Sequence, residues 1–156
     1  MDHAKQLRTI ALVCLLLGPI LAVMAFVMHG GVLLYEHART QPHFVLTDLG
    51  PLTDLMFSFA ARSFLWMVGL GVGFTVTGFL GRRPGRSGRL ALIAAGWIGV
   101  VGMVVLTVIW MQQVERLELS VLWHVLGVAL HGIQLVAIAR GLLYLSSRPV
   151  IETTGG

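Results

Sequence analysis

Four long apolar stretches divide this sequence, and they constrain its fold more than any other feature. They run from about Thr9 to Leu34, Ser63 to Leu80, Leu90 to Met111 and Ser120 to Leu145. A helix of about 20 residues crosses a hydrocarbon core about 30 Å thick. Because lipid cannot satisfy the polar groups of an open strand, all four stretches must be helices. The sequence therefore predicts an all-α integral membrane protein with a four-transmembrane-helix bundle.

The composition supports lipid as part of the solvent of this protein. Hydrophobic residues make up 56% of the 156 residues and charged residues 12%, whereas soluble domains carry about 25% charge. A chain of this size leaves much of its surface exposed when it folds. We expect one membrane domain over residues 1–156, with the lipid bilayer as a partner. The net charge of +4 does not indicate nucleic acid, because the arginines concentrate in one short loop.

The positive charges predict the orientation of the spans. Lys5 and Arg8 precede the first span, four arginines lie in the segment GRRPGRSGR between the second and third, and Arg148 follows the fourth. The other two loops carry carboxylates beside their arginines. Cytoplasmic loops are enriched in Lys and Arg, so both termini and the arginine loop are expected in the cytoplasm. The pattern resembles that of many small four-span bacterial membrane proteins, which implies the bacterial inner membrane.

The segment between the first two spans, residues 36–62, is the longest connection. Pro51 is suited to a first helical turn. Apolar residues then recur at helical spacing, at Leu52, Leu55, Met56 and Phe59. This pattern predicts a short helix on the outer surface, or an extension of the second span beyond the membrane.

Small residues recur at four-residue spacing in the second and third spans. They are Gly69, Gly73, Thr77 and Gly81 in the second span and Ala95 and Gly99 in the third. Small side chains allow helices to approach closely and to gain van der Waals contact in lipid. We expect them to mediate helix packing, either within this bundle or against another membrane subunit or a second copy.

Three histidines lie inside the predicted spans. His29 and His124 are each about five residues from the outer end of their span, and His131 follows His124 by about two turns. Ionisable groups within the membrane are costly and are frequently functional. Two imidazoles on facing helices ligate a b-type haem, so the hypothesis is a haem b held by His29, His124 or His131. The alternative is a neutral histidine that donates to a carbonyl or to Gln134.

Other chemistry has little support in the sequence. His37 and His43 lie near Glu36 and Asp48, but this spacing matches no tight metal motif, and we prefer a solvated loop. Cys14 is the only cysteine, so it cannot form an internal disulfide. No predicted span contains Asp or Glu, and HExxH, GxSxG and Walker motifs are absent. We therefore expect no catalytic residues.

Three functional hypotheses remain. The first is a structural or accessory subunit of a larger bacterial membrane complex, such as a respiratory or photosynthetic one. The second is a b-type haem protein that transfers electrons near the outer face. The third is a small oligomeric pore or carrier, assembled through the face that holds Gly69 and Gly73. A visible absorption spectrum separates the first two hypotheses, and solute flux into liposomes tests the third.

Overall fold

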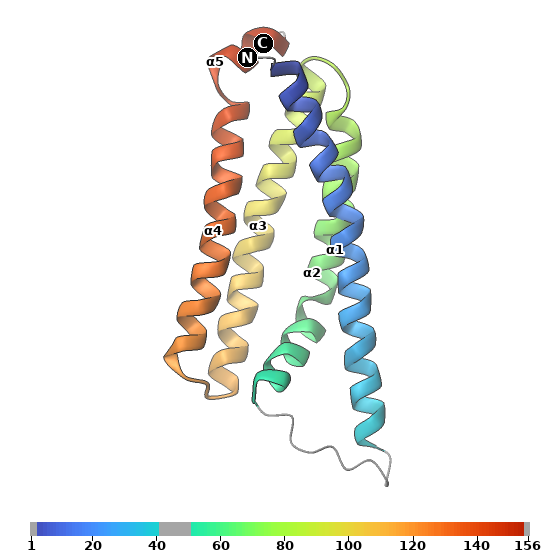
Figure 1. The fold of residues 1–156 in the computed structure, drawn as a ribbon, viewed down its shortest axis with the longest axis vertical. Coiled ribbons are helices and arrows are strands. Elements are labelled where there is room, and N and C mark those ends of the chain that lie inside the picture. Colours follow the sequence, from blue (N-terminus) through green and yellow to red (C-terminus); the bar gives the residue numbers. More distant parts are fainter. Residues whose placement is uncertain (1–2, 41–50, 155–156) are drawn as a thin grey trace.

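The computed structural model describes residues 3–40 and 51–154, and its secondary structure is helical with no strand in this part (Figure 1). The helices are α1 His3–Arg39, α2 Pro51–Gly81, α3 Arg86–Arg116, α4 Val121–Leu145 and α5 Arg148–Thr154. Helices α1 to α4 are long and apolar enough to cross a membrane. The predictions of an all-α fold and of four candidate spans are confirmed.

The helices extend beyond the apolar stretches. The segment from Pro51 is not a separate short helix, because it continues without a break into the second span as far as Gly81. The extension, which was the alternative prediction, is therefore correct. Leu55 is fully buried, so the first turns of α2 are packed against the bundle rather than laid out on a surface. Residues 41–50, which include His43 and Asp48, lie outside the described part.

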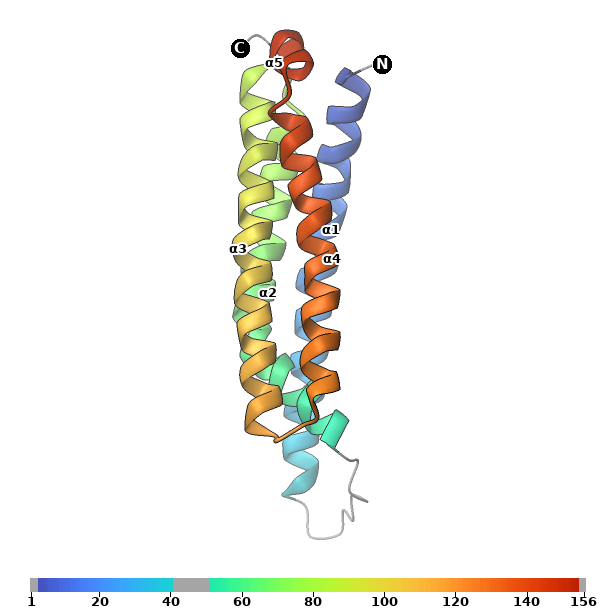
Figure 2. The ribbon, with the colours of Figure 1, turned by 90° about the vertical axis from the view of Figure 1, so that its left-hand side faces the viewer.

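The four long helices pack in chain order, each against the next (Figures 1 and 2). We call the end with the two termini, the α2–α3 turn and α5 the termini end, and the opposite end the far end. Within the described residues, no Cα of α1 lies within 8 Å of a Cα of α4. Side chains link these helices at the termini end, where Nδ1 of His3 lies 3.0 Å from the hydroxyl of Tyr144. The bundle is therefore open between α1 and α4.

The closest helix approach is between α1 and α2. A Cβ built on Gly78 would lie 2.5 Å from the backbone nitrogen of Leu15, and one on Gly18 would lie 2.5 Å from the carbonyl of Gly71. Only glycine permits this backbone contact, because any side chain would force the helices apart. Glycines that do not belong to the predicted stripe therefore set the α1–α2 distance.

The buried side chains form two small clusters rather than one large core. One contains Leu70, Phe74, Ala95 and Leu106, and the other, near the termini end, contains Ala11, Leu92 and Leu145. Many large apolar side chains point outward instead, as on α4, where Leu122 is 69% and Ile133 71% exposed. An apolar exterior around a small core is the arrangement expected of a membrane protein.

Candidate functional site

The small residues of the predicted stripe divide between the inside and the outside of the bundle. Five of the six lie inside: Gly73, Thr77, Gly81, Ala95 and Gly99. A Cβ on Gly73 would meet Ile98 of α3 at 3.2 Å, and one on Gly99 would meet Ile138 of α4 at 3.1 Å. Gly69 differs, since a Cβ there would have nothing within 4 Å.

Gly69 opens onto an apolar hollow between α2 and α3. The hollow has a volume of about 370 Å³ and is bordered by Trp66 and Trp97. The pore hypothesis assigns contact between subunits to the face that holds Gly69 and Gly73. Gly69 is free for contact with another helix, whereas Gly73 is covered by Ile98.

The ring of His29 lies flat on Phe64 of α2, with the ring centroids 4.4 Å apart and the planes at 20°. Its Nδ1 atom is buried and has no hydrogen-bond partner among the described residues. Stacking on Phe64 therefore fixes the imidazole, while one ring nitrogen is left without a partner.

His124 and His131 lie on α4, both half-buried. The Nδ1 atom of each is buried and, in the described part of the chain, has no hydrogen-bond partner. Since α1 and α4 do not pack together, the structure does not bring His29 into contact with either residue. Three histidines with a buried unpaired nitrogen thus stand on the two helices that border the open side of the bundle.

Gln134 lies near the middle of α4 and is exposed, although residues on the same helical face at both ends of α4 are buried. Gly127, seven residues earlier, is buried against Trp110, and Leu145, about three turns later, is 3% exposed. These three residues share one face of α4. Gln134 remains exposed because α1 does not cover this face, and no hydrogen-bond partner of its amide is found among the described residues.

A polar cavity of about 390 Å³ lies at the far end. It is bordered by Glu36 of α1, Asp54 of α2 and Arg116 of α3. Gln113 also lines it, is fully buried, and finds no hydrogen-bond partner for either amide atom within the described residues. Sequence reasoning missed Gln113, because the apolar stretch ends near Met111 and the residues beyond it were expected outside the membrane.

The described residues contain no group of three or more His, Cys, Asp or Glu side chains that could hold a metal ion. Of the four outer-loop residues considered for a metal site, Glu36 and His37 are described, whereas His43 and Asp48 lie outside the described part.

Comparison with known proteins adds no further assignment: no family model, curated protein or solved structure matches this chain.

Proposed function

We propose that this protein is an accessory subunit of a larger bacterial membrane complex. In this proposal it binds a transmembrane helix of another subunit in the open space between α1 and α4, from Tyr144 to His124. The observation that carries the proposal is Gln134, an exposed amide without a partner among the described residues, on the face of α4 that it shares with Gly127 and Leu145. An amide left unpaired in hydrocarbon costs several kcal/mol. A polar or small residue on an incoming helix would remove this cost.

The burial of α4 supports the same proposal. Of the most apolar 18 residues of α4, 6% are buried, against 28% for α2 and 28% for α3. Gly141 lies two turns from Gln134 on the same face, and a Cβ there would have nothing within 4 Å. A small residue beside a polar one is typical of helix–helix interfaces in membranes, where packing and hydrogen bonds replace the hydrophobic drive.

Photocrosslinking in native membranes tests this proposal. A photoreactive amino acid replaces Gln134 in one variant and Val128 in the control, since Val128 is also exposed on α4 but faces another direction. We expect a covalent adduct with another polypeptide from position 134 and none from position 128. An adduct of twice the mass of the chain identifies a second copy as the occupant. Lipid adducts alone at both positions would refute the proposal.

A haem b is the second candidate function, favoured by the buried, unpaired Nδ1 atoms of His29, His124 and His131. These residues would hold the haem, which supplies one-electron transfer when bound. A histidine that ligates a metal normally donates its other ring N–H to an acceptor. If one of these histidines bound haem iron through Nε2, its Nδ1–H would have no acceptor among the described residues.

The visible spectrum of the purified protein tests the haem candidate. We expect a reducible b-type band that is lost in His124→Ala and kept in the control His37→Ala, a histidine near the end of α1. A colourless, folded preparation isolated from cells supplied with haem precursor excludes this function without affecting the subunit proposal.

For the orientation, we propose that the termini end faces the cytoplasm of a bacterial inner membrane. The termini end carries Lys5, Arg8 and the four arginines of the α2–α3 turn, and the acidic residues of α1 to α4 lie toward the far end (Figure 1). The test uses a Cys14→Ser background with either Ser87→Cys or Ser120→Cys. A membrane-impermeant maleimide should label Ser120→Cys in spheroplasts and Ser87→Cys only after lysis. The reverse pattern would invert the topology.

A further inference from the structure

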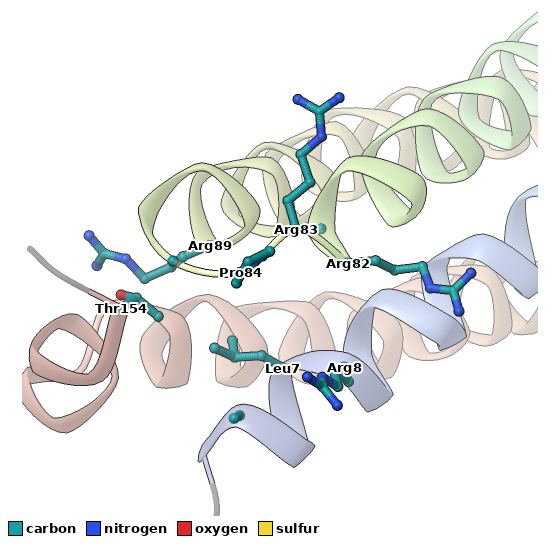
Figure 3. Close-up of a pocket in the computed structure, with 10 residues that line it drawn as sticks. Leu7, Arg8, Arg82, Arg83, Pro84, Arg89 and Thr154 are labelled. Atoms are coloured by element: carbon teal, nitrogen blue, oxygen red, sulfur yellow. The ribbon is translucent and has the colours of Figure 1, made fainter.

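A cavity of about 220 Å³ lies at the termini end, between the start of α1, the α2–α3 turn and α5. Its walls come from Leu7 and Arg8 of α1, from the turn between Gly81 and Arg89, and from Thr154 of α5 (Figure 3). A water molecule takes about 30 Å³ in the liquid, so the cavity can hold a group of several heavy atoms.

The walls of this cavity carry positive charge that no acidic residue neutralises within residues 3–40 and 51–154. Arg8, Arg82, Arg83 and Arg89 all line it, and none of them forms an ion pair within the described residues. Figure 3 shows these side chains diverging: Arg89 runs past Thr154 on one side, Arg82 extends in the opposite direction, and Arg83 is turned away from both. The one acidic residue that the structure describes near this end, Glu152 of α5, is exposed.

Arg89 is the residue that points most directly to a ligand. It is 9% exposed, and its Nε atom is buried without a hydrogen-bond acceptor in the described part of the chain. A charged N–H that is buried without an acceptor has lost its hydrogen bond to water, and an anion bound beside Nε of Arg89 would restore one. Guanidinium groups bind phosphate through paired N–H donors.

The start of α3 borders the same cavity, because Gly85 and Arg89 both line it. Gly85 caps this helix with φ 81° and no side-chain hydrogen bond, and the first turn contains no acidic residue. The first N–H groups of a helix have no partner within the helix, and the helix dipole favours an anion there. An anion in this cavity would therefore lie close to the positive end of the α3 dipole.

We propose that this cavity binds a phosphate ester, and that its source is the headgroup of an anionic phospholipid. The cavity lies at the end of four helices long enough to cross a bilayer, and the headgroups of a bilayer crossed by these helices would lie beside it. Leu7 and the apolar flank of α1 continue from its wall toward the membrane interior, where acyl chains would lie. Basic pockets between transmembrane helices bind such headgroups in other membrane proteins.

The experiment measures the thermal midpoint of the purified full-length protein in a neutral detergent. The probes are cardiolipin, phosphatidylglycerol, phosphatidylcholine and sodium phosphate. The variants are Arg89→Gln and, as a second lining residue, Arg8→Gln. Arg86→Gln is the matched control for Arg89→Gln, because it removes the same charge from the first turn of α3 at an exposed residue that does not line the cavity. Helical circular dichroism checks that each variant is folded.

We expect saturating cardiolipin or phosphatidylglycerol to raise the midpoint of the wild type and of Arg86→Gln by roughly 5–10 °C. The apparent Kd should rise at least about tenfold in Arg89→Gln and Arg8→Gln. If sodium phosphate gives the same variant-dependent shift, the site binds a free phosphate rather than a lipid. Equal responses of all variants, or an anionic-lipid response no larger than that to phosphatidylcholine, overturn the proposal.

Discussion

The indole Nε1–H of Trp110 on α3 donates a hydrogen bond to the backbone carbonyl of Trp123 on α4, with the nitrogen and oxygen 3.0 Å apart. The Trp110 ring also meets Phe59 of α2 edge-on, at a centroid distance of 5.5 Å. One side chain thus connects three helices near the far end. Tryptophans near helix ends are typical interfacial anchors, and here one of them is in addition a structural link.

Removing the donor tests this link. Trp110→Phe keeps an aromatic ring but loses the hydrogen bond to Trp123, which should lower the free energy of unfolding by about 1 kcal/mol. Trp97→Phe on the same helix is the control, since the Trp97 side chain is 59% exposed and packs little. Denaturant or SDS titration followed by circular dichroism measures both. Equal losses in the two variants would contradict the structural role of Trp110.

A substitution at Gly127 tests whether the Trp110 ring packs directly against the backbone of α4. A Cβ at this position would overlap the Nε1 and Cδ1 atoms of Trp110. Gly127→Ala should therefore destabilise the protein by about 1–3 kcal/mol through overpacking. In the control Gly132→Ala, the new Cβ has nothing within 4 Å, and the better helix propensity of alanine should raise stability by up to about 1 kcal/mol. Opposite signs in one unfolding assay are the expected result.

The α1–α2 contact predicts that alanine substitutions at two glycines of α2, Gly78 and Gly69, will differ in their effect on stability. In Gly78→Ala the new Cβ would lie 2.5 Å from the backbone nitrogen of Leu15, so the two helices must move apart. We expect a clear loss of thermal stability. Gly69→Ala, which opens onto the hollow beside Trp66, should be neutral in the isolated protein. If Gly69→Ala is the more damaging variant in detergent, the assignment of inner and outer glycines is wrong.

Tyr144 predicts a measurable coupling between α1 and α4. Its hydroxyl lies 3.0 Å from Nδ1 of His3 and donates a hydrogen bond to Oε1 of Gln6. Tyr144→Phe should cost about 1–2 kcal/mol, since two hydrogen bonds are lost. In a double-mutant cycle with His3→Ala, the two changes should deviate from additivity by at least about 0.5 kcal/mol. Strict additivity would mean that the side chains do not interact.

The sequence predicted the candidate site only in part, because contacts between helices depend on how the helices pack. Spacing along one helix places Gly73 and Gly69 on the same face, yet in the structure Ile98 covers Gly73 and leaves Gly69 open. Spacing likewise cannot show that Phe64 stacks on His29, since that contact depends on the register between α1 and α2. In the sequence, Arg89 is one of four arginines that predict a cytoplasmic loop. Only the packing around it reveals that it is buried.

The sequence by itself determined the number of candidate spans, their approximate positions and their apolar character, because solubility in lipid is a local property of each stretch. It did not predict the short helix α5. The tertiary structure decided the rest: the continuity of α2 from Pro51, the glycines that set helix distances, and the opening between α1 and α4 that exposes Gln134. These features depend on how side chains distant in the sequence fit together, and hydropathy carries no information about that fit.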